Sequence, residues 1–446
     1  MFDVKIAYLP IGRKTFDIES ANRIFEETRD YLTSVCHCVQ APKQIITSPD
    51  ELGEVLSGMV SNDVDCIVYQ MTTFADAEFI VKVMESCKQP IVVWSVREPE
   101  IGGRLRLNSL TGGNSSCHAL RYYERDFDFI YGNPSEIGVQ AKLESKFAAK
   151  QTHRKLAALT VGVLGDHPPG FYFSGTDEVE LHRKIGVNLH HIDLHRMFKE
   201  ALELDEEAWK PMLDRAASMV VGLDKSDESA VKFAKFSTCL KQYVDRHHIT
   251  ATAVRCWPEF FAELGAAACS TLSQFIEDGI VSSCESDIHG AVTMFIQREL
   301  SGGLPPYLGD LVLLNEANNS VVFWHCGAGA YSLAHPAVGA KAGVQPNRKL
   351  GFALDFGLKP GKITISRLSK SFDGYRMLIM RGEALDEPQP FTGTSVSVKL
   401  NGQADQIVHS LMLGGFEPHY SIIYDDIVDK LKELCKLLKI EYVIFE

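Results

Sequence analysis

Up to about residue 300, the chain alternates short β-rich runs with longer amphipathic helix patterns, and this alternation limits the folds it can adopt. Residues 4–10, 65–70 and 90–95 read as strands, and a helix pattern follows each of the first two. Strands that alternate with helices predict parallel sheets joined by right-handed crossovers. A new strand pattern begins near residue 156. We therefore predict two doubly wound α/β domains, residues 1–155 and 156–303, with a helix over residues 259–275 in the second.

The pattern changes in the C-terminal third of the chain. Short β runs there are separated by Asn318-Asn319, Lys359-Pro360-Gly361 and Phe372-Asp373-Gly374, which is the turn chemistry of antiparallel hairpins. Residues 304–446 are predicted to form a third domain, mostly antiparallel and barrel-like. The predicted fold class is α/β, with two parallel-sheet domains followed by this β-rich domain.

Composition narrows the class of protein. A chain of 446 residues exceeds what one hydrophobic core supports, and a net charge of −13 disfavours a nucleic-acid surface. No apolar run approaches the length of a membrane span, and no secretory signal pattern opens the sequence. Eleven cysteines without a CxxC pair indicate reduced thiols. We expect a cytoplasmic protein that binds neither nucleic acid nor membrane.

Two carboxylates and one imidazole are candidates for the chemistry. Glu285 directly follows an apolar strand pattern, Asp310 comes one element later, and His419 lies near the C-terminus. Oxygen and nitrogen donors of this kind suit Mn²⁺ or a similar divalent ion, and carboxylates also transfer protons. A purely local cluster of Glu285, Asp287 and His289 on one strand face is an alternative. The helix pattern that follows disfavours it and makes Asp287 a helix cap.

The order and spacing of these residues resemble the L-fucose/L-arabinose isomerase family. Its members carry a Glu-x-Asp turn, here at Glu285, then a second aspartate, here Asp310, and a histidine after a Gly-rich segment, here His419. The resemblance implies a metal-dependent aldose–ketose isomerase in which these three residues bind Mn²⁺ or another divalent metal. Glu285 and Asp310 would also be catalytic, moving a proton between C1 and C2 of an open-chain sugar through a cis-enediolate.

Two further residues are candidates for contact with the sugar. His325 ends a β run, and the resemblance makes it either a fourth metal ligand or a hydrogen-bond partner of the substrate. Trp257 lies between a strand and a helix pattern, where its ring could stack on a sugar face.

A glycine-rich loop in the first domain carries cationic and amide donors. Glycines let a backbone approach a ligand, and Arg and Asn side chains supply hydrogen-bond donors. The resemblance implies that this loop reaches the active site of a neighbouring subunit in a homo-oligomer. The residues predicted to bind substrate there are Arg97, Arg104, Arg106 and Asn108.

The sequence leaves the substrate open. A pentose or 6-deoxyhexose is the default that the resemblance implies. The arginine loop favours an anionic sugar, because arginine binds oxyanions through several donors. A 6-sulfonated hexose, converted from sulfoquinovose to sulfofructose, is then the alternative substrate. A non-catalytic sugar-binding or regulatory protein and a metal-dependent aldolase or hydrolase are the alternative functions.

Overall fold

The computed structural model describes residues 1–59 and 64–445. The chain divides into two compact units, residues 1–151 and residues 152–446. The three-domain division predicted from the sequence stays a prediction, since its second and third domains both lie within unit 2.

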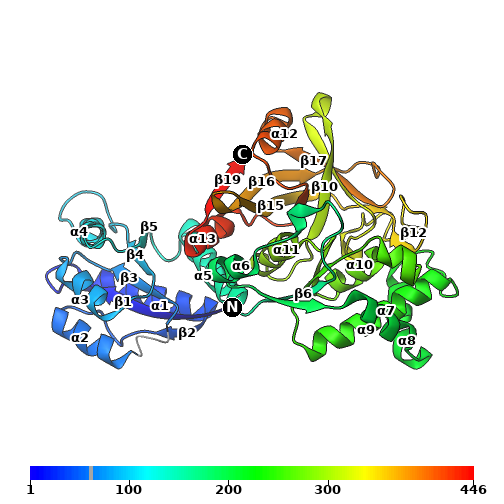
Figure 1. Cartoon of the computed structure of the whole chain (residues 1–446). Helices are drawn as coiled ribbons and strands as arrows, with labels where there is room; N and C mark the ends of the chain where they lie inside the picture. The colour runs from blue at the N-terminus through cyan, green and yellow to red at the C-terminus, as the bar shows by residue number, and fades with distance from the viewer. Residues whose placement is uncertain (60–63, 446) are drawn as a thin grey trace. The chain divides into compact units, whose positions relative to one another are not determined.

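Unit 1 is a doubly wound α/β domain (Figure 1). Its strands pair in the order β2-β1-β3-β4-β5, and every pairing is parallel. The strands are β1 (Phe2–Ile11), β2 (Cys36–Gln40), β3 (Cys66–Met71), β4 (Ile91–Ser95) and β5 (Phe127–Tyr131). The helices are α1 (Ile18–Val35), α2 (Pro49–Gly58), α3 (Glu78–Ser86), α4 (Ser109–Tyr122) and α5 (Ile137–Ala157).

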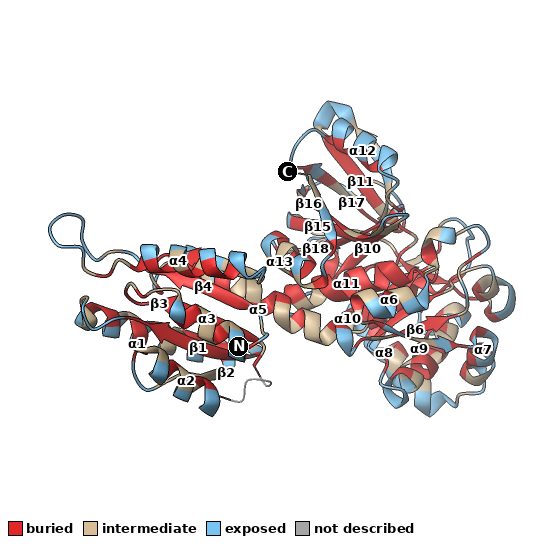
Figure 2. Cartoon of the chain, turned by 60° about the vertical axis from the view of Figure 1, so that its left-hand side comes forward, coloured by how far each residue is buried: buried red, intermediate tan, exposed pale blue. Residues whose placement is uncertain are grey.

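The sheet of unit 1 is buried on both faces. One core combines strand residues with Leu52, Phe79 and Leu120 from α2, α3 and α4. The other combines strand residues with Phe25 and Phe147 from α1 and α5. All residues of β3 are buried (Figure 2), as expected for a central parallel strand covered by helices on both sides.

Unit 2 begins with a second parallel sheet, in the order β7-β6-β8-β9. Its strands are β6 (Thr160–Leu164), β7 (Asn188–Ile192), β8 (Ala251–Val254) and β9 (Val281–Cys284). Its helices are α6 (Glu178–Ile185), α7 (Leu194–Leu202), α8 (Glu206–Met219), α9 (Glu228–Arg246), α10 (Cys269–Glu277) and α11 (Ile288–Leu300). The two predicted parallel sheets are therefore confirmed.

The rest of unit 2 is a mixed sheet that is mostly antiparallel, as predicted, while its predicted barrel-like form stays a prediction. Its order is β14-β17-β11-β10-β18-β15-β16-β19, and β16 also pairs with β17. The strands of this region are β10 (Tyr307–Asn315), β11 (Ser320–His325), β12 (Ala342–Val344), β13 (Phe352–Leu354), β14 (Phe356–Gly357), β15 (Gly361–Ser371), β16 (Gly374–Ala384), β17 (Thr394–Leu400), β18 (His419–Ile423) and β19 (Glu441–Phe445). The two helices are α12 (Ala404–Leu413) and α13 (Val428–Leu438). Strands β12 and β13 form a separate pair.

Helix α11 joins the two sheets of unit 2. It contacts β6, β8 and β9 on one side and β10, β15 and β18 on the other (Figure 1). Nearly all of its residues are buried, as expected for a helix with no solvent-facing side. This packing brings the end of β9 close to β10 and β18, the strands that carry Asp310 and His419.

The single helix predicted over residues 259–275 is wrong. The structure has a π-helical turn at Phe260–Leu264 and then α10, which begins at Cys269. Gly265 separates them with a φ of 64°, a left-handed conformation that ends a helix. The apolar residues on both sides of this break share one core, which explains why the sequence reads as continuous.

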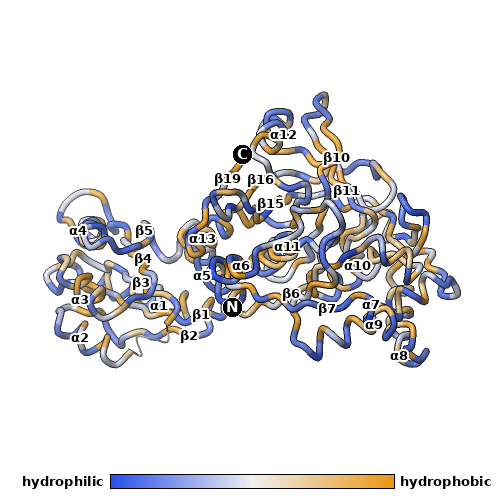
Figure 3. Tube along the Cα trace, in the orientation of Figure 1, coloured by the Kyte–Doolittle hydropathy of each residue, from blue (hydrophilic) through white to orange (hydrophobic). Residues whose placement is uncertain are grey.

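Among the described residues, no helix is long and apolar enough to cross a membrane. Figure 3 shows hydrophilic and hydrophobic segments alternating along the chain.

Candidate active site

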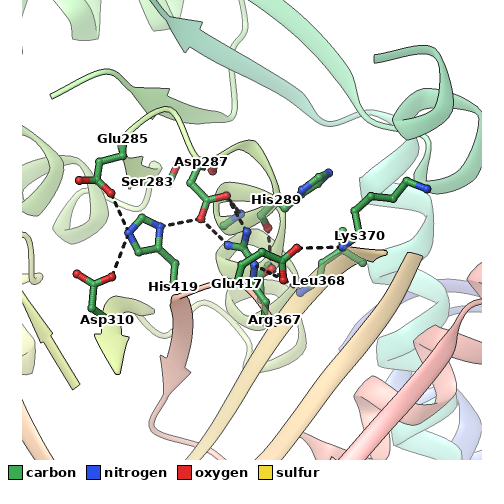
Figure 4. Close-up of polar contacts among 12 residues, drawn as sticks. Ser283, Glu285, Asp287, His289, Asp310, Arg367, Leu368, Lys370, Glu417 and His419 are labelled. Carbon is green, nitrogen blue, oxygen red and sulfur yellow. Dashed lines mark hydrogen bonds and ion pairs between the residues drawn. The ribbon is translucent and has the colours of Figure 1, made fainter. Parts of the chain in front are cut away.

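Glu285 lies at the carboxyl end of β9, in a sharp turn that leads into α11. Glu285 and Ser286 both have left-handed backbone conformations, with φ values of 58° and 52°, which are uncommon for residues other than glycine. Asp287 then caps α11 by accepting a hydrogen bond from Gly290 N at 2.9 Å. The predicted cap is confirmed, and the turn sends Glu285 and Asp287 to opposite sides of His419 (Figure 4).

Asp310 and His419 are direct partners on two neighbouring antiparallel strands. The register of β10 and β18 sets them opposite each other, and residues paired in this way project from the same face of a sheet. His419 Nε2 lies 3.5 Å from Asp310 Oδ1 and 3.1 Å from Glu285 Oε2. The three residues predicted from the sequence thus converge on one point (Figure 4).

The orientation of the His419 ring is fixed by Asp287. Nδ1 lies 2.9 Å from Asp287 Oδ2, so this nitrogen donates its proton to the carboxylate. In the neutral ring Nε2 then keeps its lone pair. Nε2 is buried and makes no well-directed hydrogen bond, although both carboxylates are close. A metal-binding histidine is held in this way by a carboxylate on its other nitrogen.

Asp287 is itself held by a buried arginine. Arg367 of β15 donates two hydrogen bonds to it, the one from Nη2 to Oδ1 measuring 3.0 Å. Both side chains are completely buried. Arg367 Nε also lies 3.7 Å from Oε2 of Glu417, and the other oxygen of Glu417 accepts a hydrogen bond from Lys370 N (Figure 4). These buried charged residues lie on the Nδ1 side of the His419 ring.

The pKa values of the ionisable groups in the site are shifted in different directions. Burial lowers the pKa of His419, but its close contacts with the carboxylates of Asp287 and Glu285 outweigh burial and raise the pKa to about 10. Burial raises the pKa of Asp310. The pKa of Glu285 is lowered, because the His419 contacts outweigh the opposing effect of burial. Two carboxyl groups with pKa values shifted in opposite directions suit acid–base chemistry.

His325, at the end of β11, lies beside His419 with a distance of 5.7 Å between ring centroids. Its Nδ1 accepts a hydrogen bond of 2.9 Å from the backbone N–H of Cys326. The neutral ring therefore carries its proton on Nε2, which is buried without a partner. Burial lowers the pKa of His325 and so favours this neutral form. His325 thus offers a donor at Nε2, whereas His419 Nε2 offers a lone pair once its proton has left.

A pocket of about 180 Å³ opens beside Glu285 and His325. Trp257 forms part of its wall, and its Nε1 donates a hydrogen bond of 3.3 Å to Glu285 Oε1. Two phenylalanines from the loop after β6 complete the surroundings: Phe171 packs against Trp257 at 5.4 Å between ring centroids, and Phe173 packs against His419 at 5.2 Å. The indole and these rings limit the access of water to the carboxylates.

The predicted substrate residues of the N-terminal loop lie in unit 1, and their role stays a prediction. Two of the guanidinium groups already have acidic partners: Arg97 binds both oxygens of Glu136, and Arg106 binds Asp17. Arg104 donates to a backbone oxygen, Thr15 O, at 3.1 Å. Asn108 has a φ of 53° and precedes α4.

Sequence reasoning missed part of the site. It favoured Asp287 as a helix cap over a local ligand cluster, and it did not foresee that Asp287 orients His419. Arg367 was not singled out, although a lone arginine inside the apolar strand pattern Ile363-Thr-Ile-Ser-Arg-Leu368 signals a buried charge that needs a partner. Gln345, Asn347 and Arg348, which line the pocket, lie in a polar loop that carries no such signal.

Comparison with known proteins relates the whole chain to sugar isomerases. Residues 348–446 match the family described as "L-fucose isomerase, C-terminal domain". The chain is 52% identical to a protein of Priestia megaterium named sulfoquinovose isomerase, over all of both chains. It is 48% identical to one of Alkalicoccus urumqiensis over 99% of each chain and 37% identical to one of Clostridium sp. over all of both, both with that name.

The resemblance predicted from a few motifs thus extends over the full length of the chain. These relatives favour an isomerase over a non-catalytic binding protein or an aldolase, the alternatives that the sequence left open. The chain therefore belongs to the L-fucose isomerase-like family and is an aldose–ketose isomerase.

Proposed function

We propose that this protein converts sulfoquinovose to sulfofructose in a metal-dependent reaction. The convergence of Glu285, Asp310 and His419 beside a pocket is the observation that carries the proposal. The substrate is inferred from the names of the full-length relatives. A pentose or 6-deoxyhexose has no comparable support.

The residues at this point fit a divalent cation. Suitable donor atoms of Asp310, His325 and His419 lie within 4.8 Å of one another, and a carboxylate oxygen of Glu285 is 3.1 Å from His419 Nε2. The buried Nε2 atom without a hydrogen bond is the kind of group that a metal ion satisfies. Hard oxygen donors with an imidazole suit Mn²⁺, and Glu285, Asp310 and His419 would hold it. His325 would join them only in the tautomer with its proton on Nδ1, and its hydrogen bond from Cys326 N–H favours the other tautomer.

The carboxylates perform the proton transfer in the proposed mechanism. When bound, a divalent cation would supply Lewis acidity at the C1 and C2 oxygens. One carboxylate removes the proton from C2 of the open-chain aldose, and the electron pair of that C–H bond forms the C1=C2 bond of a cis-enediolate. A carboxylic acid then delivers a proton to C1, and C2 becomes the ketone. The hydroxyl proton moves from O2 to O1, so the product is an isomer.

His325 and Trp257 would orient the sugar. The Nε2–H of His325 points a donor into the pocket without a protein partner, so it suits a substrate oxygen. The indole of Trp257 holds Glu285 through Nε1, and its ring offers an apolar surface to the C–H groups of the sugar. The homo-oligomer with shared active sites remains a prediction.

The proposal predicts loss of activity on removal of metal. Protein treated exhaustively with a chelator and checked by elemental analysis should no longer form sulfofructose from sulfoquinovose. Added Mn²⁺ should restore the reaction, because three ligands of the site are preserved in the apoprotein. Titration of the metal-free protein with Mn²⁺ measures metal binding directly, without depending on turnover. An unchanged rate in metal-free protein would contradict the metal requirement.

A further inference from the structure

The pocket beside Glu285 is lined by chemically different residues. Glu285 and His325 belong to the group of residues around His419, and Gln345, Asn347 and Arg348 come from one polar loop. Trp257 and Phe261 supply apolar surface. A pocket with an acidic reaction centre, an apolar wall and a cationic rim suits a substrate that is neutral at one end and anionic at the other.

Arg348 is the only lysine or arginine among the described residues that line this pocket. Its Cζ atom lies 5.9 Å from the centroid of the Trp257 ring, within the range of a cation–π contact. Within the described part of the chain it forms no ion pair, and its side chain is exposed. Its guanidinium donors are therefore available to a ligand, unlike those of Arg97 and Arg106, which bind carboxylates of their own unit.

The loop that carries Arg348 is held by hydrogen bonds at its base. Gln345 is buried, and its Oε1 accepts a hydrogen bond of 2.5 Å from Arg348 N. The backbone oxygen of Gln345 accepts from Lys349 N at 2.8 Å, and its N–H donates to Gly351 O at 3.1 Å. A Cβ at Gly351 would lie 2.3 Å from Ala267 N, so this end of the loop is tightly packed. The loop can thus hold Arg348 at the rim with little loss of entropy on binding.

Trp257 links Glu285 to Arg348. Its Nε1 contacts the carboxylate of Glu285, and its ring lies under the guanidinium of Arg348. The two charged groups thus lie at different parts of a single indole. Arg348 attracts an anionic substituent of a sugar, and the rest of that sugar can then extend along the indole toward Glu285.

We infer that Arg348 is the residue that binds the sulfonate of the substrate and selects 6-sulfonated aldoses. This inference rests on the proposed function and offers an alternative to the sequence-based assignment of the anion to Arg97, Arg104 and Arg106, which stays a prediction. A sulfonate remains ionised throughout the physiological pH range and presents three oxygens, which match the several donors of a guanidinium. Asn347 supplies a further amide donor at the same rim.

The test compares a charged and an uncharged ligand of the same shape. The non-isomerisable alditols 6-deoxy-6-sulfo-D-glucitol and 6-deoxy-D-glucitol are titrated calorimetrically into the metal-loaded protein and its Arg348→Ala variant. Loss of one charge-assisted contact should weaken binding of the sulfonated alditol by about 10–100-fold. Binding of the neutral alditol should change by less than about threefold. On sulfoquinovose, KM should rise while kcat changes little, because the contact is equally present in ground and transition states.

Matched variants distinguish this role from a structural one. Arg348→Lys should recover part of the affinity for the sulfonated alditol. Lys349→Asn removes the neighbouring charge and suits the left-handed backbone at this position (φ 54°), so it should leave selectivity unchanged. Equal binding of the sulfonated alditol by wild type and Arg348→Ala would overturn the inference. Wild-type protein that binds this alditol through Arg348 yet does not convert sulfoquinovose would contradict the proposed function alone.

Discussion

Glu285→Gln and Asp310→Asn should each lower kcat by more than the roughly 10²–10⁴-fold that one acid–base group contributes. In the proposed mechanism each change removes a metal-ligand charge and a proton-transfer group together. Both carboxylates lie within 3.5 Å of the same nitrogen, His419 Nε2. Steady-state kinetics on sulfoquinovose at saturating Mn²⁺ measures the effect.

Asp405→Asn is the matched control for these variants. Asp405 is exposed on α12, so its replacement changes the net charge equally without touching the site. Its turnover should stay at the wild-type value. Near-normal turnover of either site variant, with metal shown to be bound, would exclude that residue from the reaction.

Arg367→Met should lower the free energy of unfolding by about 3–5 kcal/mol, the typical cost of removing one partner of a buried ion pair. Arg367 and Asp287 are both fully buried, and methionine leaves the carboxylate of Asp287 without its bidentate partner. Chemical denaturation monitored by circular dichroism measures the change. Because Asp287 also orients His419, Mn²⁺ affinity should fall in the same variant.

Arg196→Met is the control for this stability effect. Arg196 pairs with Glu200 one helical turn away, and both side chains are exposed to solvent. Surface pairs of this kind contribute little to stability, so the free energy of unfolding should be almost unchanged. A similarly small effect of Arg367→Met would show that the buried network is not a significant source of stability.

The parts of the fold that follow local patterns could be predicted from the sequence. Strand–helix alternation predicted both parallel sheets, and the cap at Asp287 follows from the helix pattern after it. The break at Gly265 was missed, because apolar residues on both sides of it enter one core and hide the interruption.

The three residues of the proposed metal site were predicted from their order in the chain, but their contacts depend on strand register. Asp310 and His419 meet only because β10 pairs with β18. The Asp287–Arg367 pair joins residues separated by 80 positions, which no local pattern can indicate. Arg348 gains significance only from the position of its loop beside Trp257.

Conversion of sulfoquinovose in D₂O, followed by NMR, tests the central claim most directly. Proton transfer through carboxylates that exchange with solvent predicts that Mn²⁺-loaded protein forms sulfofructose and that deuterium accumulates at C1. Recovered sulfoquinovose should accumulate deuterium at C2, and both signals should disappear in Glu285→Gln and Asp310→Asn. Failure to form sulfofructose, or formation of sulfofructose that never acquires deuterium at C1, would contradict the account.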